Sequence, residues 1–475
     1  MKEMKVDVCV IGAGSGGLSV ASGSAQLGVK TVLIEKGEMG GDCLNYGCVP
    51  SKALLHVGKV AQTIRKADQF GITVGEPQVD YAKAMDHVHE AIARIAPHDS
   101  QERFEGLGVH VIRDFGRFVD SHTVEAGDTR IKAKFFVIAT GSSAFVPPVP
   151  GLADVPYLTN ENLFEQTEKP EHLAIMGGGP IGIEMAQAHA RLGSKVTVIE
   201  MAPTIMGKDD PDLVDIVRQR LIAEGIDLLE GTKVAEISGT AGDLSLTLEG
   251  AEGASTLKAS HLLVATGRKA NTDGLNLEAA GVDYTRAGIT VKPNMRTSQR
   301  HIFAIGDVAG GPQFTHMAGH HASVVVREML FRMAAKAETK TVPWVTYTDP
   351  ELAQIGMTET AAREAGFDPK VELTQIGGVD RYIAEGVDGG LAKLVFDSKG
   401  KLIGAGMVAP NAGDLIAPLG LVISGQVKIS TLASQIVPYP THADVPKRMA
   451  GAHLAPTLFA DRTRMLISWL LKLPA

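Results

Sequence analysis

Two of the chain's three cysteines, Cys43 and Cys48, lie in the segment GGDCLNYGCVPSK. A disulfide between them would close a very short loop and add little stability, so a structural crosslink is a weak interpretation. Zinc prefers about four ligands, and His56 is the only further donor nearby, so a metal site is disfavoured as well. We therefore expect the pair to be a redox centre rather than a structural disulfide or a metal site.

The residues after Cys48 predict a helix. Pro50 suits the first turn of a helix, and the segment SKALLHVGKVAQTIRKA continues with helical spacing of apolar residues. Cys48 should thus lie at or beside a helix N-terminus, where the helix dipole favours the thiolate and lowers the pKa of the thiol.

A dinucleotide-binding unit is predicted just before the cysteines. The apolar run VDVCVI predicts a buried strand, and Gly12, Gly14 and Gly17 follow it in a G-x-G-x-x-G pattern that opens a helix. These glycines allow a tight turn, close approach of a pyrophosphate and close packing of helix on strand. Glu35 ends the next strand, at the distance where a carboxylate binds the adenosine ribose.

The same unit recurs later, with Gly177, Gly179, Gly182 and Glu200 in the corresponding places. From first glycine to acid both copies span 23 residues, 12 to 35 and 177 to 200, which indicates two dinucleotides. Because a carboxylate at Glu200 would repel the 2'-phosphate of NADP, we expect NAD in the second copy. Strands at 135–142 and 261–268 both contain Ala-Thr-Gly and would each close one nucleotide domain, and Asp307 ends a further strand where it could meet a ribityl chain.

Composition narrows the class of protein. Hydrophobic residues make up 44% of the chain and the formal net charge is −8, without a dense basic block, so a globular protein that does not bind nucleic acid is expected. Three cysteines, no visible export signal and no long apolar run predict a cytoplasmic location. Cys9 lies in the first strand and should be a core residue.

Taken together, these motifs resemble those of the FAD-dependent pyridine nucleotide-disulfide oxidoreductases, which include dihydrolipoamide dehydrogenase, glutathione reductase and mercuric reductase. The segment VPWVTYTDPELAQIGMTETAAREAG extends the resemblance into the C-terminal third. It implies an α/β protein with two Rossmann-like dinucleotide-binding domains and a C-terminal α+β interface domain that forms a homodimer. The implied boundaries are 1–145 with 271–340 for FAD, 146–270 for NAD, and 341–475 for the interface.

The resemblance also implies roles for single residues. Cys48 would be the thiol nearest the flavin, Cys43 would exchange with substrate, and Lys52 would lie by the flavin ring, paired with Glu184. The implied cofactor contacts are Gly12, Gly14, Ser15, Gly17, Glu35, Lys36, Lys52, Gly116, Thr140, Gly141, Asp307, Gln313, Phe314, Thr315 and His316 for FAD, and Gly177, Gly179, Gly182, Glu200, Val234 and Gly267 for the nicotinamide cofactor. His316 and His320 have metal-ligand spacing, but a helix covering the flavin is favoured over a metal site.

Three positions depart from the family pattern. The family's His-Pro-Thr-x-x-Glu run is replaced by PYPTHADVPKR, which places Tyr439 at the histidine and Asp444 at the glutamate. A phenol near neutral pH is a poor base compared with imidazole, and His442 should point the other way. Asp42 replaces the usual threonine before the first cysteine and is expected to raise the pKa of the Cys43 thiol.

The sequence thus predicts an NAD(H)-dependent disulfide oxidoreductase that is similar to dihydrolipoamide dehydrogenase and acts on a small disulfide, a dithiol or another electron acceptor. Two alternatives stay open: a mercuric reductase-like enzyme, although the usual terminal cysteine pair is missing, and a slow flavin redox sensor. The tail after Ala455 carries Arg462, Arg464, Trp469 and Lys472. It fits a helix on a membrane surface, a partner-binding tail, or packing on the chain's own interface domain.

Overall fold

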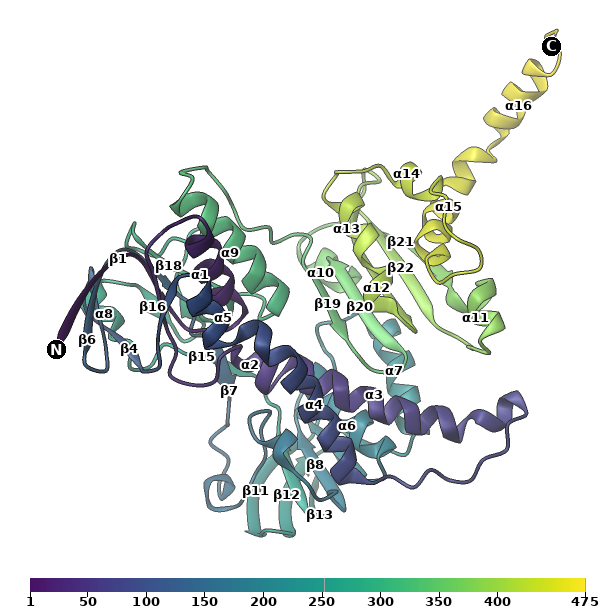
Figure 1. Cartoon of the computed structure of the whole chain (residues 1–475). Helices are drawn as coiled ribbons and strands as arrows, with labels where there is room; N and C mark the ends of the chain where they lie inside the picture. The colour runs from purple at the N-terminus through teal and green to yellow at the C-terminus, as the bar shows by residue number, and fades with distance from the viewer. Residues whose placement is uncertain (252, 475) are drawn as a thin grey trace. The chain divides into compact units, whose positions relative to one another are not determined.

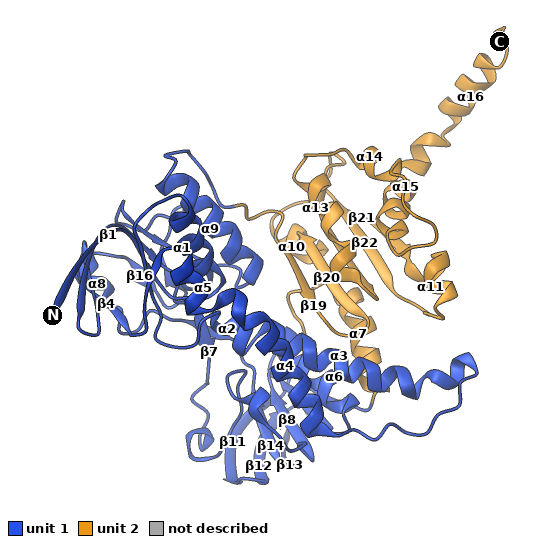
Figure 2. Cartoon of the chain, viewed as in Figure 1, with its two compact units in different colours: residues 1–203, 225–337 blue, residues 204–224, 338–475 orange. Residues whose placement is uncertain are grey.

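The computed structural model describes residues 1–251 and 253–474, which separate into two compact units (Figure 2). Unit 1 comprises Met1–Pro203 and Gly225–Ala337, and unit 2 comprises Thr204–Glu224 and Glu338–Ala475. The helices and strands of both are labelled in Figure 1. In the described residues, no helix combines the length and the apolar character needed to cross a membrane.

The first sheet of unit 1 has seven strands in the order β3-β2-β1-β6-β5-β4, with β18 paired to β6. Five of them run parallel, because β1 pairs in parallel with β2 and β6, β2 with β3, and β6 with β18. The strands are β1 (Lys2–Ile11), β2 (Thr31–Ile34), β3 (Val109–Ile112), β4 (Gly116–Asp120), β5 (Thr123–Ala126), β6 (Thr129–Ile138) and β18 (Ile302–Ala304).

The centre of this sheet is buried on both faces. Val8, Cys9 and Val10 in β1 are fully buried, as expected for a parallel strand covered on both sides. Helix α1 (Ser15–Gln26) packs against α9 (Thr315–Met329). The core position predicted for Cys9 is confirmed.

A second, smaller parallel sheet repeats the arrangement, in the order β10-β9-β8-β14, beside an antiparallel sheet β11-β12-β13. Its strands are β8 (His172–Met176), β9 (Lys195–Glu200), β10 (Asp227–Glu230), β11 (Lys233–Thr240), β12 (Asp243–Gly250), β13 (Gly253–Ala259) and β14 (His261–Val264). Helix α6 (Pro180–Arg191) follows β8 just as α1 follows β1. Two Rossmann-like halves are therefore present, as predicted.

Unit 1 contains further helices and short strands outside these sheets. They are α2 (Gly41–Asn45), α3 (Cys48–Arg65), α4 (Tyr81–Asp99), α5 (Gln101–Gly106), β7 (Ser142–Ala144), β15 (Arg268–Ala270), α8 (Leu277–Ala280), β16 (Tyr284–Thr285) and β17 (Gly288–Ile289). Helix α3 packs against both α4 and α6, and β7 pairs with β15.

Unit 2 contains an antiparallel sheet of five strands in the order β19-β20-β23-β22-β21. Its strands are β19 (Pro343–Thr346), β20 (Glu351–Gly356), β21 (Lys370–Gln375), β22 (Leu391–Phe396) and β23 (Leu402–Ala409). Its helices are α7 (Pro211–Ala223), α10 (Glu359–Glu364), α11 (Asp380–Ala384), α12 (Ala412–Leu415), α13 (Ala417–Ile423), α14 (Ile429–Ala433), α15 (Asp444–Leu458) and α16 (Asp461–Leu470).

The predicted three-domain boundaries and the two observed units describe the chain differently. Thr204–Glu224 clusters with unit 2, whereas the sequence places it in the NAD domain of 146–270. The FAD domain of 1–145 with 271–340 and the NAD domain both contribute to unit 1. The division into three functional domains stays a prediction.

A buried ion cluster ties α7 to the sheet of unit 2. Lys393 on β22 is only 3% exposed, and its Nζ lies 2.9 Å from Glu359 Oε2, 3.0 Å from Asp212 Oδ2 and 3.4 Å from Asp210 Oδ2. Asp210 is 1% exposed. Removing one partner of a buried ion pair leaves an uncompensated charge, which is strongly destabilising.

We expect Lys393→Met to lower the free energy of unfolding of unit 2 by about 3–5 kcal/mol, because Asp210 would stay buried without its cation. Urea unfolding followed by the fluorescence of Trp344, in a Trp469→Phe background, measures the change. The matched control is Lys370→Met, whose exposed pair with Glu372 should be worth about 1 kcal/mol or less. Equal effects of the two variants would contradict the prediction.

Candidate active site

The two cysteines lie on consecutive short helices of unit 1. Cys43 is on α2 and is half-buried, and α3 begins at Cys48, which is exposed; both are free thiols in this structure. The helix N-terminus predicted at Cys48 is confirmed.

The N-terminus of α9 meets the same place from far along the chain. Thr315, the first residue of α9, has its Oγ1 3.4 Å from the Sγ of Cys48. The neighbouring rings of Phe314 and His316 stack with centroids 5.1 Å apart. The stretch from Gln313 to His316, expected to contact FAD, is therefore next to the redox cysteine, a thiol contact that the sequence did not predict.

The two thiols differ in acidity. The pKa of Cys48 is lowered to about 6, chiefly by the hydrogen bond that Cys43 donates; Thr315 and the charge of Lys52 act in the same direction, and burial opposes them. The same hydrogen bond and burial raise the pKa of Cys43. Asp42 raises the Cys43 pKa in the expected direction, but it is the weakest of the named causes. Near neutral pH, Cys48 is thus a thiolate and Cys43 keeps its proton.

Lys52 and Glu184 form the expected ion pair. Lys52 Nζ donates to Glu184 Oε2 at 2.7 Å, joining α3 to α6 across 132 residues of sequence. The Glu184 side chain is 5% exposed, whereas that of Lys52 is 36% exposed. The lysine charge is therefore held one helical turn from Cys48; its place beside a flavin stays a prediction.

A polar network links Asp42 to Asp307. Arg268 Nη2 lies 3.0 Å from Asp42 Oδ1, and Arg268 Nε donates to Ser142 Oγ at 2.7 Å. Ser142 Oγ in turn donates to Asp307 Oδ2 at 2.6 Å, while Asn160 Nδ2 donates to Asp42 Oδ1 at 2.9 Å. Burial raises the pKa of Asp307, opposed by Ser142 and Arg268.

Sequence reasoning missed three members of this network: Arg268, Ser142 and Asn160. Arg268 and Ser142 each follow one of the two Ala-Thr-Gly segments, which was the available signal for them. The arginine compensates the charge of Asp42, which explains how a carboxylate is tolerated beside the cysteines.

Both glycine units have the shape that a dinucleotide requires. Gly12 and Gly177 have φ of +107° and +113°, which side chains rarely adopt. A Cβ on Gly17 would lie 1.8 Å from the carbonyl oxygen of Gly12, and one on Gly182 would lie 2.0 Å from that of Gly177.

The middle glycines face open space. A Cβ on Gly14 would meet nothing closer than 4.0 Å, and one on Gly179 would meet nothing within 4 Å. A pyrophosphate could therefore approach the backbone at the N-termini of α1 and α6.

The two predicted ribose carboxylates are held identically. Glu35 accepts from the backbone N–H of Ala13 at 2.6 Å and of Gly37 at 2.7 Å. Glu200 accepts from Gly178 at 2.6 Å and from Ala202 at 2.6 Å. Each carboxylate braces its own glycine loop and keeps lone pairs free for a ribose hydroxyl.

The remaining predicted cofactor positions have ordinary surroundings. Ser15 begins α1, the Lys36 Nζ lies 5.6 Å from the Phe115 ring centroid, and Gly116 begins β4. Thr140 Oγ1 donates to the Asn271 carbonyl at 2.7 Å, and the Gly141 carbonyl accepts from the Asn271 N–H at 3.0 Å, where the FAD domain was expected to resume.

Val234 and Gly267 belong to the second half. Val234 is buried in the core of that half, and Gly267 has a φ of +123° with open space around it.

The substituted acid-base positions lie in unit 2. Tyr439 is 77% exposed and donates to Asp380 Oδ2 at 2.8 Å, a bond that raises the pKa of the phenol. Arg448 bridges Asp380 to Asp444. His442 bonds instead to Glu385 Oε2 at 2.8 Å. These contacts make Tyr439 a poor proton acceptor.

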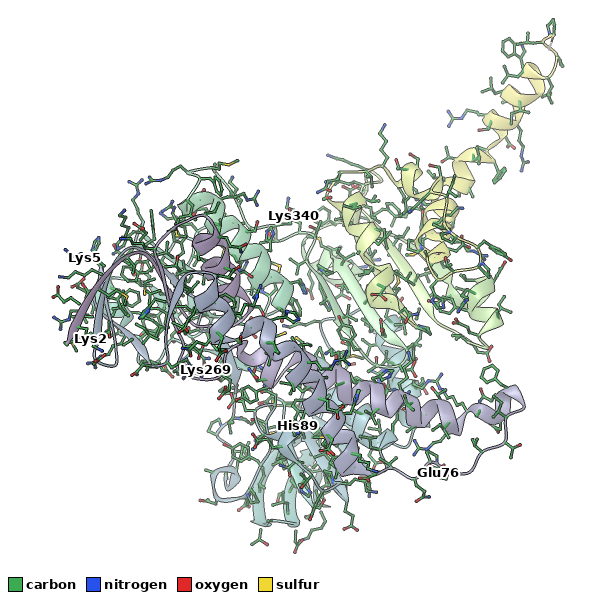
Figure 3. All side chains as sticks on the ribbon, in the orientation of Figure 1. Lys2, Lys5, Glu76, His89, Lys269 and Lys340 are labelled. Atoms are coloured by element: carbon green, nitrogen blue, oxygen red, sulfur yellow. The ribbon has the colours of Figure 1, made fainter. Side chains whose placement is uncertain are left out.

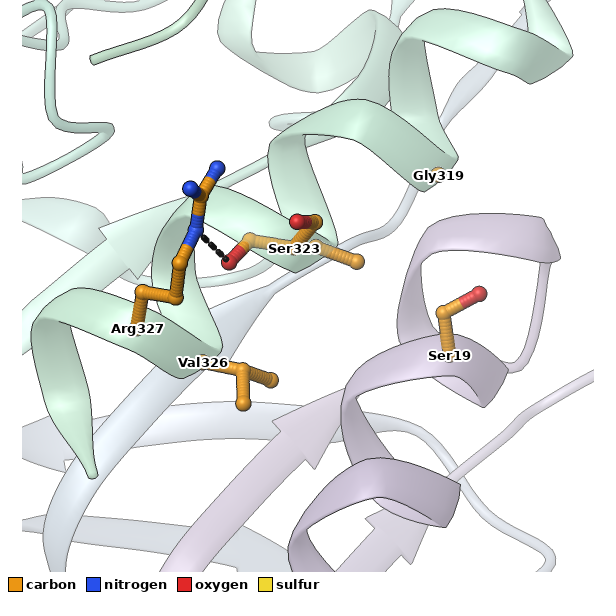
Figure 4. A pocket seen from close by; sticks show the side chains of 6 residues that line it. Ser19, Gly319, Ser323, Val326 and Arg327 are labelled. Carbon is orange, nitrogen blue, oxygen red and sulfur yellow. Dashed lines mark hydrogen bonds between the residues drawn. The ribbon is translucent and has the colours of Figure 1, made fainter. Parts of the chain in front are cut away.

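Other candidate sites are weaker. The described part of the chain contains no group of three or more His, Cys, Asp or Glu that could hold a metal. A shallow pocket of about 310 Å³ between α1 and α9 is shown in Figure 4, and it is lined by Ser19, Gly319, Ala322, Ser323, Val326 and Arg327. None of the predicted site residues lines it.

The structure has two glycine loops shaped to bind dinucleotides and, at a helix N-terminus, two thiols with different pKa values. Together these features define an electron-transfer protein that works through two dinucleotides. The sequence profile of the pyridine nucleotide-disulphide oxidoreductases matches residues 6–322, and the profile of their dimerisation domain matches residues 342–450. The chain belongs to this family, whose members are FAD-dependent enzymes that use NAD(P)H.

Known relatives agree with this assignment. Mercuric reductase of Lysinibacillus sphaericus is 33% identical over 94% of this chain and 82% of that protein. Mercuric reductase of Streptomyces lividans is 32% identical over 94% of this chain and 95% of that protein. The structure of the HOCl-induced flavoprotein disulfide reductase RclA from Escherichia coli matches with a TM-score of 0.84 at 27% identity, covering 94% of this chain and 99% of that chain.

The difference between the pKa values of Cys43 and Cys48 predicts how alkylation of the thiols depends on pH. In the reduced enzyme, the rate at which iodoacetamide modifies Cys48 should fall as the pH drops through about 6, because the thiolate becomes protonated. Lys52→Met should move this midpoint upward, since the lysine charge lowers the Cys48 pKa.

Peptide mapping by mass spectrometry identifies the modified residue. Lys59→Met, which changes an exposed lysine on the same helix, serves as the control. An unmoved midpoint in Lys52→Met would contradict the electrostatic role.

Proposed function

We propose that the protein is a homodimeric NAD(H)-dependent flavoprotein that passes electrons through FAD and the Cys43–Cys48 pair to an acceptor that reacts with thiols. The main support is the difference in acidity between the two cysteines, because it gives them different tasks. The homodimer is supported by the dimerisation-domain match over residues 342–450.

FAD held at the first glycine unit by Gly12, Gly14 and Glu35 would supply the two-electron chemistry that connects a nicotinamide hydride to reduction of the Cys43–Cys48 disulfide. The chain then holds a Cys48 thiolate and a Cys43 thiol, with Lys52 and Thr315 stabilising the charge on Cys48. Cys43 loses its proton to Cys48 as its sulfur attacks a disulfide substrate. One substrate sulfur joins Cys43 in a mixed disulfide, and the other leaves as a thiolate that is protonated by water.

The second half of the exchange regenerates the oxidised pair. Cys48, once it has lost the proton to solvent, attacks the Cys43 sulfur and displaces the remaining substrate thiolate. The acceptor thus gains two electrons and two protons, and the cysteines form their disulfide.

A dihydrolipoamide dehydrogenase-like reaction is the first form of this proposal. Removal of a proton from a dithiol substrate is its demanding step, and the contacts of Tyr439 with Asp380 do not favour it. Reduction of a thiophilic metal ion is the second candidate, supported by relatives that are mercuric reductases. A slow redox sensor is the third, and rapid turnover would exclude it.

A panel of acceptors separates these forms. Purified enzyme should oxidise NADH repeatedly with at least one of lipoamide, glutathione disulfide or Hg(II). Cys43→Ser should lower that rate by about three orders of magnitude or more, because the attacking sulfur is lost, while NADH still bleaches the flavin. Cys9→Ala, which alters the buried third cysteine, is the matched control and should keep the rate.

Two results would contradict parts of this proposal. Full activity in Cys43→Ser would exclude thiol chemistry altogether. Turnover of none of the acceptors by the unmodified enzyme would favour the sensor.

The choice of nicotinamide cofactor depends on Glu200. The ratio of kcat/KM for NADH over NADPH should be about tenfold or more, and it should fall toward unity in Glu200→Gln, because the repulsion of a 2'-phosphate is removed. Steady-state rates with both cofactors measure the ratio.

Glu35→Gln, the same change in the first glycine unit, is the control. It should alter FAD retention without changing the NADH to NADPH ratio. A preference for NADPH in the unmodified enzyme would contradict the assignment.

A further inference from the structure

The C-terminal helix α16 stands apart from the rest of unit 2. Helix α15 packs on unit 2 through buried Val445 and Met449, and its His453 ring stacks on that of Phe396 with centroids 4.2 Å apart and bonds to Glu372. Beyond it α16 projects outward with side chains on all sides (Figures 1 and 3). None of its described residues is buried, so the expected alternative of packing on the interface domain is not observed.

This helix exposes an unusual amount of apolar surface. Leu471 is 80% exposed and Trp469 is 58% exposed. The other exposed apolar side chains of the tail are Leu458, Phe459, Met465, Leu466, Ile467, Leu470 and Leu473. A contiguous apolar surface of this kind marks an interaction site rather than ordinary solvent-facing surface.

The polar residues in the later part of α16 form one narrow stripe. Beyond the first turn, where Asp461, Arg462 and Thr463 are polar as well, Arg464 and Ser468 are four residues apart and lie on one face of the helix, and Lys472 follows just after its end. From 465 to 471 every residue except Ser468 is apolar, so apolar side chains point in the other directions around this part of the chain. After its polar first turn, the helix is therefore apolar around most of its circumference.

The width of this apolar surface distinguishes between two possible partners of the helix, a second copy of itself and a bilayer surface. A pair of helices from two copies buries a narrow seam and needs polar residues elsewhere. A helix at a bilayer surface can sink a wide apolar arc among the acyl chains and turn its polar stripe to the headgroups. At ten residues the helix is about 15 Å long, which is too short to span a bilayer.

The charge of the tail indicates which kind of membrane it would bind. The tail carries Arg462, Arg464 and Lys472 against a single acid, Asp461, whereas the whole chain has a net charge of −8. The tail is therefore a local positive segment in a chain that is negative overall. We propose that α16 and the residues just after it lie in the surface of membranes rich in anionic phospholipid and thereby hold this redox enzyme at the bilayer.

Vesicle binding tests this proposal. The FAD-loaded enzyme should co-sediment with vesicles of equimolar phosphatidylglycerol and phosphatidylcholine about tenfold more than with phosphatidylcholine alone, and less at high salt. The emission of Trp469 should shift to the blue on binding. Leu466→Ser with Leu470→Ser should abolish sedimentation, and Arg462→Gln with Arg464→Gln should remove the preference for anionic lipid.

Leu373→Ser, at a 54% exposed leucine on β21, is the matched control and should bind as the unmodified enzyme does. Turnover in solution should be unchanged in all tail variants, which separates this test from that of the proposed function. Failure to bind either vesicle would overturn the proposal. So would a change of oligomeric state in the double leucine variant without vesicles, which would make α16 a contact between copies.

Discussion

The ion pair between Lys52 and Glu184 is the interaction on which the site depends. It joins the helix that starts at Cys48 to the helix that starts at the second glycine unit, so one contact sets the sulfur against both nucleotide-binding halves. The Glu184 side chain is almost fully buried, and Lys52 places a cation 2.7 Å from it. The same cation then lowers the pKa of Cys48. The charge of Lys52 therefore contributes both to the packing of the two helices and to the acidity of the Cys48 thiol.

Much of the local structure could be read from the sequence. The run VDVCVI, the glycine spacing and the helix after Cys48 are short-range patterns whose physics lies within about ten residues, and the structure has each of them. The Lys52–Glu184 contact was implied only by family resemblance, since nothing in the spacing of residues 132 positions apart predicts it. The bond from Thr315 to Cys48 and the bridge from Arg268 to Asp42 were missed for the same reason.

Asp42 and Tyr439 show why departures from a family pattern need structural context. From the sequence, Asp42 is expected to raise the pKa of the Cys43 thiol; in the structure Arg268 pairs with Asp42, Asn160 donates a hydrogen bond to it, and its effect on that pKa is small. Tyr439 suggests a substitute acid, but its proton is already donated to Asp380. In both cases a partner distant in sequence changes the chemistry that the residue type alone would indicate.

Glu35 and Glu200 each hold the glycine loop that precedes them through one backbone N–H, and each also accepts from the N–H two residues further along the chain. The entropy of ordering these loops is thus lost when the chain folds, and little of it remains to be lost when a nucleotide arrives. When the loop is already ordered, little binding free energy is lost to ordering it, so the contacts of the nucleotide contribute almost in full to the affinity. Under the proposed function, one half retains FAD and the other releases its nicotinamide after every cycle; because the two loops are held alike, that difference in residence time must arise outside them.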